Sequence, residues 1–318
     1  MAPQVPQSYT SLPLRHIKVS HVPESSPSAT EVVLITLNRP TKQNAFTEIM
    51  RVEIEKVYEI IDADDRVKVV VITGAGRSFC AGADLEIGFL GADDGKGGTK
   101  NAKTERDVDH RDGGGRASLA IHRSTKPTIC ALQGAAVGVG ITMCLPAAIR
   151  IAYAKAKVGF VFSRRGLIME ACSSFFLPRL IGHSRALHLT TTGSVYTADN
   201  PLFGTLFSET LPTPEAVLPR ALELADEIAK NTSTVSTKMM RDLMYRGPDS
   251  AEGAHLLDSR IIHGLFGSKD NREGVQSFLE KRPAKFTGVV PANAPDGYPW
   301  WQPVDIGPKT LDPRHAKL

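Results

Sequence analysis

The chain has 318 residues, of which 42% are hydrophobic and 23% charged, so it can bury a substantial core and is neither disordered nor fibrous. Its formal net charge of +4 arises from 38 basic and 34 acidic residues without a dense basic run, which argues against a nucleic-acid-binding protein. Four widely spaced cysteines form no C-x-x-C pair, so we expect reduced packing residues in an intracellular protein and no metal site: Cys80, Cys130, Cys144 and Cys172.

The first elements are predicted from hydrophobic periodicity. Residues 1–14 form a lead that we expect to be flexible, and they lack the apolar segment of a secretory signal. Alternating apolar residues at 15–21 and 31–38 predict a β-hairpin. Helical spacing over 46–62 predicts a helix, with Thr47 as its N-cap.

The middle of the chain predicts a β/α succession. An apolar run at 68–73 indicates a buried strand, whereas residues 91–115, rich in Gly, Asp and Lys, predict a mobile loop or lid. The uncharged stretch at 127–149 is as long as a membrane span, but its glycines and proline favour a buried strand, a tight turn and a buried helix, with no membrane span. The other elements expected here are helices at 117–122 and 141–145 and strands at 128–132 and 150–154.

The C-terminal part predicts helices followed by an extended tail. Helical periodicity runs over 214–282, and the segment beyond 286 carries prolines at short intervals, which predict a mostly extended tail. Anchoring of this tail to a surface is one explanation of Trp300 and Trp301, and local packing is the more common one. The chain therefore divides into a lead at 1–14, a β/α core at 15–212 that contains the loop at 91–115, a helical block at 213–286 and a tail at 287–318.

Two glycine-rich segments each follow an apolar strand. VVVITGAGRSFCAGADL at 69–85 begins like a dinucleotide loop with Gly74 and Gly76, but Phe79 stands where the third glycine belongs. An NAD-binding Rossmann oxidoreductase is therefore kept only as a remote alternative. Small residues here and at 134–140 would instead let two backbone N–H groups approach one carbonyl oxygen, which is the design of an oxyanion hole.

Several segments resemble one known family, the enoyl-CoA hydratase/isomerase or crotonase superfamily. The resemblance spans roughly residues 15–285, and the matching segments are LITLNRPTKQNAF (34–46), VVVITGAGRSFCAGADL (69–85), QGAAVGVGITMCL (133–145) and VFSRRGLIMEACSSFFLPRLIG (161–182). It implies an α/β fold, a spiral of stacked ββα units with a C-terminal helical block. It also implies an acyl-CoA thioester as the substrate, with coenzyme A as part of that substrate and no further cofactor.

The resemblance also assigns residues to the site. It implies that the N–H groups of Ala83 and Val139 bind the thioester oxygen. Lys42 is expected near a phosphate of CoA, although a solvated lysine in a turn explains it as well. The substrate-binding set implied in this way is Lys42, Ala81, Gly82, Ala83, Asp84, Leu85, Gly138 and Val139.

The carboxylates depart from the hydratase pattern. Hydratases of this family carry glutamates at positions that correspond here to Thr142 and Phe162. Glu170, in M-E-A-C-S-S, instead matches the glutamate of a motif in peroxisomal Δ3,Δ2-enoyl-CoA isomerases, where it carries the proton. Moving a double bond needs one carboxylate, whereas hydration commonly uses two. A glutamate that merely begins a helix is the alternative explanation of Glu170.

The sequence thus predicts an enzyme that isomerises the double bond of an unsaturated acyl-CoA from Δ3 to Δ2, with Glu170, Ala83 and Val139 as the catalytic residues. The nearest alternative is an enoyl-CoA hydratase, or a hydratase/isomerase of secondary metabolism, for which an acid in the loop at 91–115 would supply the second carboxylate. A non-catalytic binding homologue is a remote alternative. The resemblance implies a homotrimer or a homohexamer.

The final three residues predict a location. Ala316-Lys317-Leu318 is a conservative variant of the S-K-L peroxisomal address. We therefore expect a peroxisomal protein that is recognised by the import receptor through this tripeptide.

Overall fold

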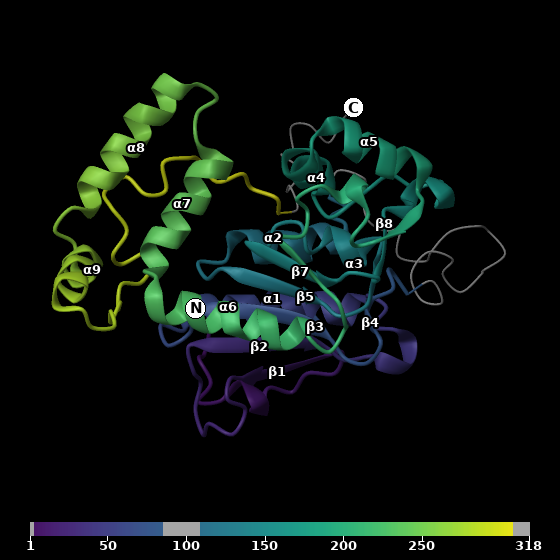
Figure 1. The fold of residues 1–318 in the computed structure, drawn as a ribbon, viewed down its shortest axis with the longest axis horizontal. Coiled ribbons are helices and arrows are strands. Elements are labelled where there is room, and N and C mark those ends of the chain that lie inside the picture. The colour runs from purple at the N-terminus through teal and green to yellow at the C-terminus, as the bar shows by residue number, and fades with distance from the viewer. Residues whose placement is uncertain (1–2, 85–108, 308–318) are drawn as a thin grey trace, which may run out of the picture.

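The computed structural model describes residues 3–84 and 109–307. Two sheets organise them (Figure 1). The larger has the strand order β1-β2-β3-β5-β7-β10, and the smaller has the order β4-β6-β8-β9. The strands of the larger sheet are β1 (Ile17–His21), β2 (Val32–Leu37), β3 (Val69–Gly74), β5 (Thr128–Leu132), β7 (Ile149–Tyr153) and β10 (Glu209–Leu211). Those of the smaller are β4 (Ser78–Cys80), β6 (Ala135–Val137), β8 (Lys157–Gly159) and β9 (Val195–Thr197).

The pairing within the larger sheet follows the predicted pattern. β1 and β2 form the expected antiparallel hairpin, and β2, β3, β5, β7 and β10 run parallel. Parallel strands are covered on both faces and therefore read as continuous apolar runs. β3 is buried along its whole length, as the run at 68–73 predicted. The stretch at 127–149 folds as β5, β6 and α3 (Val139–Thr142), so the buried strand and a helix are confirmed, but the strand β6 was not predicted and the helix begins two residues before the expected 141–145.

Helices cover the larger sheet on both faces. On one face lies α6 (Val217–Asn231), whose small residues at every fourth position are buried against β2, β3, β5 and β7 (Figure 1). On the other face lie α1 (Glu48–Ala63) and α2 (Gly113–Arg123), packed on each other. Thr47 caps α1 as predicted, since its side chain accepts from the N–H of Met50 at 3.1 Å.

The remaining helices are two that lie between β8 and β9, α4 and α5, and three that follow α6 in the C-terminal block, α7 to α9. They are α4 (Ser173–Ile181), α5 (His183–Thr192), α7 (Thr234–Arg246), α8 (Ala251–Leu265) and α9 (Lys269–Glu280), with short 3-10 turns η1 (Tyr9–Ser11), η2 (Pro40–Lys42), η3 (Val161–Arg165) and η4 (Pro201–Phe203). The helical periodicity over 214–282 is confirmed by α6 to α9. In Figure 1, α8 and α9 stand apart from the two sheets, at the left of the view.

Three segments bear on the sequence predictions. In the lead at 1–14, Tyr9 is 1% exposed and donates to Asp64 at 3.1 Å. α2 begins at Gly113, so residues 113–115 belong to a helix and not to a loop. The tail follows the surface of α7, where Trp300 donates to the carbonyl of Arg246 at 3.1 Å. Residues 85–108 and 308–318, with most of the expected lid and the C-terminal tripeptide, lie outside the described residues.

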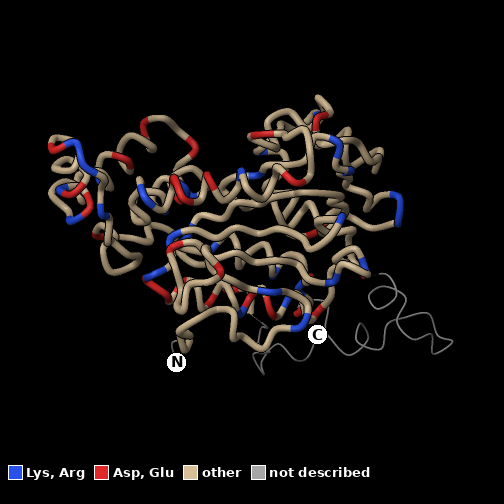
Figure 2. Tube along the Cα trace, turned by 60° about the horizontal axis from the view of Figure 1, so that its bottom comes forward, with Lys and Arg blue, Asp and Glu red and all other residues tan. Residues whose placement is uncertain are grey.

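Charged side chains of both signs are mixed over the elements (Figure 2). This distribution agrees with the small net charge and with the lack of a dense basic run in the sequence. Among the described helices, none combines the length and the apolar character that crossing a bilayer requires.

Candidate active site

The two glycine-rich bends lie side by side because the strands that precede them are paired. β4 and β6 run parallel, with Cys80 opposite Ala136, so their carboxyl ends reach the same edge of the smaller sheet. A methyl group on Gly140 would lie 2.2 Å from the carbonyl oxygen of Cys80, so only glycine permits this approach. A methyl group on Gly138 would lie 3.9 Å from the Cα of Gly82. The bends are therefore in contact.

Ala83 and Val139 occupy these bends, one in each. The neighbouring N–H groups are used: that of Asp84 donates to Phe46 at 2.9 Å, and that of Gly138 donates to Gly159 at 2.9 Å. Within residues 3–84 and 109–307, no acceptor is recorded for the N–H of Ala83 or of Val139. Two donors left over at adjacent bends are what an oxyanion hole requires. Because α3 is a single turn, the Val139 amide itself would be the donor in such a hole and the helix dipole would add little.

The carboxyl group of Glu170 points at these bends. Its Oε1 lies 2.7 Å from the hydroxyl of Thr142, one turn along α3 from Val139. A methyl group on Gly114 would lie 1.6 Å from Glu170 Oε2 and 3.0 Å from a methyl carbon of Val139. The Glu170 carboxyl and the Val139 side chain thus meet over the first turn of α2. The structure brings together Glu170 and Val139, two of the three predicted catalytic residues, and Val139 is joined through the paired bends to the third.

The environment of Glu170 favours its protonated form. Burial is the main cause and, together with the neighbouring Asp112 carboxyl, it raises the pKa of Glu170 to about 8, while the Thr142 hydroxyl acts in the opposite direction. A carboxyl group with a pKa near neutrality can both accept and donate a proton at physiological pH. Its pKa suits it to carry a proton between two atoms.

A strained turn directs Glu170 toward the bends. Ala171 and Cys172, which follow it, both have left-handed backbone conformations, with φ of 60° and 56°, although neither is glycine. Such conformations cost of order 1–3 kcal/mol each and persist where the surroundings hold them. The carbonyl of Glu170 accepts from the N–H of Ser173 at the start of α4, while its carboxyl turns away toward α3. Glu170 is therefore more than a helix-start glutamate.

Thr142 and Phe162 replace the carboxylates that the hydratase pattern places at these positions. Thr142 is buried and holds Glu170, and the Phe162 ring reaches within 4.0 Å of a methyl group placed on Gly138. A hydroxyl and an apolar ring thus stand beside the predicted oxyanion hole. Neither side chain can act as a carboxylate base.

The predicted substrate-binding residues lie mostly on the paired bends, and Lys42, Asp84 and Leu85 differ from the rest. Ala81, Gly82, Ala83, Gly138 and Val139 lie on the paired bends described above. Lys42 is exposed in η2, ahead of the first bend in the chain. Asp84 is buried, with its carboxylate 2.8 Å from the Arg39 guanidinium, so its side chain fastens the bend to the turn before α1. Leu85 lies outside the described residues.

Sequence reasoning missed the site roles of Asp112 and Gly114. Asp112 caps α2 by accepting from the N–H of Gly115, and Gly114 provides the space for the Glu170 carboxyl. The signal was an aspartate immediately before an apolar periodic segment, but three consecutive glycines hid the start of the helix. His122 lies at the other end of α2. There it contacts the rings of Phe176 and Tyr245, and burial lowers its pKa to about 3.

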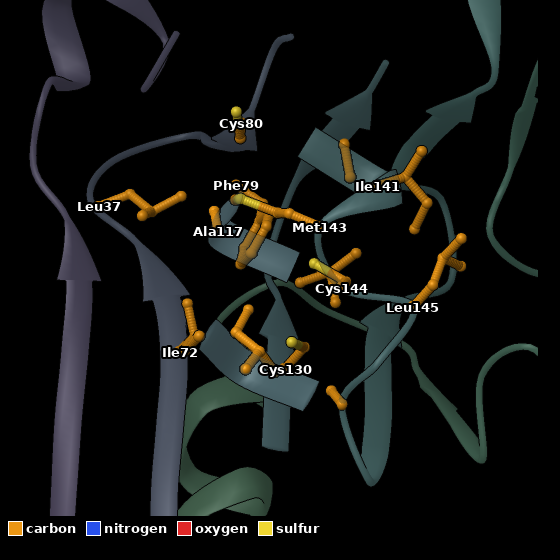
Figure 3. Close-up of a cluster of buried hydrophobic side chains, with 14 of the residues drawn as sticks. Leu37, Ile72, Phe79, Cys80, Ala117, Cys130, Ile141, Met143, Cys144 and Leu145 are labelled. Atoms are coloured by element: carbon orange, nitrogen blue, oxygen red, sulfur yellow. The ribbon is translucent and has the colours of Figure 1, made fainter. Parts of the chain in front are cut away.

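The core beneath the site holds these elements in place (Figure 3). Phe79 and Cys80 from β4, Ala117 from α2 and Ile141 from α3 are buried in one hydrophobic cluster. Cys80, Cys130 and Cys144 are free thiols in this cluster, as the prediction of packing cysteines requires. Rigid packing of this kind keeps the bends and the Glu170 carboxyl in a fixed geometry.

Comparisons with known proteins agree with this geometry. The family model described as enoyl-CoA hydratase/isomerase matches residues 28–289. Enoyl-CoA hydratase AFT3-1 of Alternaria alternata is 47% identical over 290 residues, which cover 91% of this chain and 93% of that protein. The 1,2-epoxyphenylacetyl-CoA isomerase of Escherichia coli (strain K12) is 30% identical over 279 residues, covering 81% and 95%. The crystal structure of an enoyl-CoA hydratase from Bacillus anthracis matches with a TM-score of 0.73 and 26% identity, over 86% of this chain and 100% of that one.

Proposed function

Because the chain belongs to the enoyl-CoA hydratase/isomerase family, we propose that it moves the double bond of an unsaturated acyl-CoA from the Δ3 to the Δ2 position. The observation that carries this proposal is the Glu170 carboxyl, held by Thr142 beside the bend of Val139. The family's positions for a hydratase carboxylate pair are occupied by Thr142 and Phe162, which leaves Glu170 to carry the proton. The predicted crotonase-type α/β fold is confirmed by the solved structures of the family.

The proposed reaction uses one carboxylate twice. Ionised Glu170 takes a proton from C2 of the 3-enoyl thioester, and the electron pair moves through the former double bond into the thioester carbonyl. The dienolate places its negative charge on the thioester oxygen, where each N–H group, from Ala83 and from Val139, would contribute about 3 kcal/mol of stabilisation. Glu170 then returns the proton to C4, which leaves the 2-enoyl thioester and the ionised carboxylate.

The ionisation of Glu170 determines the expected pH dependence. The group must be ionised to take the C2 proton, and its pKa is raised to about 8. We therefore expect kcat/KM to rise with pH through a midpoint near 8 and to level off above it, because kcat/KM reports ionisations of the free enzyme. An ordinary glutamate would give a midpoint near 4.3.

Hydration of an enoyl-CoA is the second candidate. Two findings favour it: relatives such as Enoyl-CoA hydratase AFT3-1 carry that name, and the carboxyl of Asp112 stands next to that of Glu170. Asp112 comes from the segment at 91–115 that the sequence considered as the source of a second acid. In this case one carboxyl would activate water and the other would protonate the α carbon.

A paired assay in deuterated water separates the two candidates. Purified protein is incubated with a 3-enoyl-CoA and with the corresponding 2-enoyl-CoA, and products are located by mass spectrometry. We expect the 3-enoyl substrate to become the 2-enoyl product, with deuterium at C4 in those turnovers in which the proton on Glu170 exchanges with the solvent before it is returned. Hydration of the 2-enoyl substrate without any isomerisation would contradict the isomerase proposal.

Two variants test the role of Glu170 in the same assay. Glu170→Gln should lower kcat/KM by at least 10³-fold, because the amide cannot carry the proton. Glu227→Gln, the same change on the exposed side of α6, serves as the matched control and should leave the rate unchanged. Equal rates for the two variants would remove Glu170 from the mechanism.

Assembly and location are further proposals. We propose that the chain forms a trimer or a hexamer, which the resemblance implies and which the exposed apolar residues of α8 and α9 support.

We also propose a peroxisomal location from Ala316-Lys317-Leu318. A fluorescent protein fused to the N-terminus should colocalise with a peroxisomal marker, and deletion of the tripeptide should leave it diffuse.

A further inference from the structure

Asp112 links the first turn of α2 to the strained turn that carries Glu170. Its Oδ1 accepts from the N–H of Gly115, which caps the helix, and from the N–H of Ala171 at 3.2 Å. Ala171 is fully buried and left-handed, and it directly follows Glu170. One carboxyl oxygen thus ties the helix to the backbone that aims the proposed proton carrier.

The carboxyl groups of Asp112 and Glu170 also lie against the same turn of α2, since a methyl group on Gly114 would meet Glu170 Oε2 and one on Gly115 would meet Asp112 Oδ2 at 2.5 Å. After burial, the neighbouring Asp112 carboxyl is a further cause of the raised pKa of Glu170. Two neighbouring carboxylates repel each other and do not ionise together readily.

The partners of each carboxyl indicate which of them holds the charge. Asp112 accepts from two backbone N–H groups at the N-terminus of an 11-residue helix, a place where anions are commonly held. Within the described residues, the Glu170 carboxyl accepts one recorded hydrogen bond, from the Thr142 hydroxyl. It has no backbone donor there to favour its ionised form.

The other titratable groups at this point do not alter that balance. The thiols of Cys80 and Cys172 face Glu170, and burial raises the pKa of each, so both are neutral. Arg123, at the far end of α2, acts on the Cys172 thiol and is not among the groups that perturb Glu170.

We propose that Asp112 is a positioning residue for Glu170: in the free enzyme the two carboxyl groups share one proton, with the proton on Glu170 and the charge on Asp112. The inference rests on the proposed function, in which Glu170 carries the proton. Asp112 then acts twice. It fixes the direction of Glu170 through Ala171, and it delays the ionisation of Glu170, which makes the ionised group a stronger base for a weakly acidic C–H bond.

The test compares Asp112→Asn and Asp112→Ala with the wild type. Asparagine keeps an oxygen for the N–H groups of Gly115 and Ala171 but removes the second titratable carboxyl, whereas alanine removes both. Asp226→Asn, on the exposed side of α6, is the matched control for the loss of one negative charge. The readouts are the pH profile of kcat/KM and an infrared titration of the full chain labelled with ¹³C-glutamate, in which Glu170→Gln identifies the signal of Glu170.

We expect the infrared midpoint of Glu170 and the midpoint of the kcat/KM profile to fall together by at least one pH unit in Asp112→Asn, with Asp226→Asn unchanged. Asp112→Ala should in addition lose at least tenfold in kcat, which asparagine restores in part, because Ala171 loses its partner. Unchanged midpoints in Asp112→Asn would overturn the proposal, since Asp112 would then be a helix cap only.

Two further outcomes separate this inference from the proposed function. If Asp112→Asn is as inactive as Glu170→Gln at every pH, Asp112 is itself a proton carrier and the positioning role is wrong. If the infrared midpoint shifts as expected but no unsaturated acyl-CoA is turned over, the shared proton stands and the proposed function fails.

Discussion

Apolar side chains are buried at the site around Glu170 but exposed on the C-terminal helices. At the site, Phe79, Cys80 and Ile141 are completely buried beneath the paired bends. Phe266, at the end of α8, and Phe278, on α9, are 65% and 82% exposed. Single exposed apolar residues are ordinary, but several on helices that stand away from the sheets form the surface on which the proposed assembly rests (Figure 1).

This difference in burial indicates that one chain can provide the whole candidate site. The bends, Thr142, Asp112 and Glu170 come from neighbouring elements of one core and need no second copy to meet. The C-terminal helices leave apolar surface uncovered within one chain. We therefore expect changes at the site to alter chemistry without altering assembly, and changes on α9 to do the reverse.

Among substitutions that leave Glu170 itself in place, the largest effect is expected for Gly114→Ala. The new methyl group would lie 1.6 Å from Glu170 Oε2, so the carboxyl must move, and a displacement of this size costs about 100-fold in rate. Folding should survive, because the obstructing atoms belong to the end of a flexible side chain and alanine favours a helix. Steady-state kinetics and circular dichroism measure the two effects.

Gly113→Ala is the matched control for that substitution. Its methyl group would lie 3.3 Å from the side chain of Arg51 and away from Glu170. We expect it to retain activity within about threefold of the wild type. If both alanine variants lose activity equally, helix α2 as a whole is sensitive and the contact between Gly114 and Glu170 is not the cause.

The next prediction concerns the free energy of unfolding and the ionisation of Glu170 at the site. The folded-state pKa of Glu170, about 8, lies above its ordinary value of 4.5, so folding favours the protonated form. The contribution of this group to stability is fully present below pH 4.5 and is lost as the pH rises toward 8. Glu170→Gln removes the titration and should therefore stabilise the protein at pH 8 by about 1–3 kcal/mol, allowing for partial exposure.

Denaturant unfolding of both proteins at pH 5 and pH 8, at one protein concentration, measures this difference. The advantage of Glu170→Gln should be larger at pH 8 than at pH 5. A variant that is less stable than the wild type at pH 8 would show that the ionised carboxylate is favourably held in the fold.

Most of the fold could be predicted from the sequence, because local patterns and global packing agree there. The run at 68–73 is a strand because it is buried on both faces, and Thr47 caps α1 because its hydroxyl can reach the N–H of Met50. The contact of the lead at 1–14 with the core could not be predicted, since the hydrogen bond from Tyr9 to Asp64 joins residues 55 positions apart and leaves no local pattern.

The site could be predicted only where backbone geometry follows local sequence. Glycines marked both bends, and their contact follows from the parallel pairing of β4 and β6. The placement of Asp112 beside Glu170 depends on where α2 begins and on the backbone of Ala171 and Cys172. Both residues are left-handed although neither is a glycine. Sequence rules assign left-handed backbone to glycine or asparagine, so they could not place this turn.

The smallest effect on the chain itself is expected for Phe278→Ser, on the other side of the comparison. Because Phe278 is 82% exposed within one chain, its loss should change the unfolding free energy of the monomer by less than about 0.5 kcal/mol. If α9 packs against another copy, the same substitution should lower the oligomeric mass measured by light scattering at micromolar concentration. Lys269→Ser, also on α9 but polar, is the control. An unchanged oligomeric mass for Phe278→Ser would show that the interface lies elsewhere. The assignment of association to α9 would then be wrong, while the conclusions about the site around Glu170 would be unaffected.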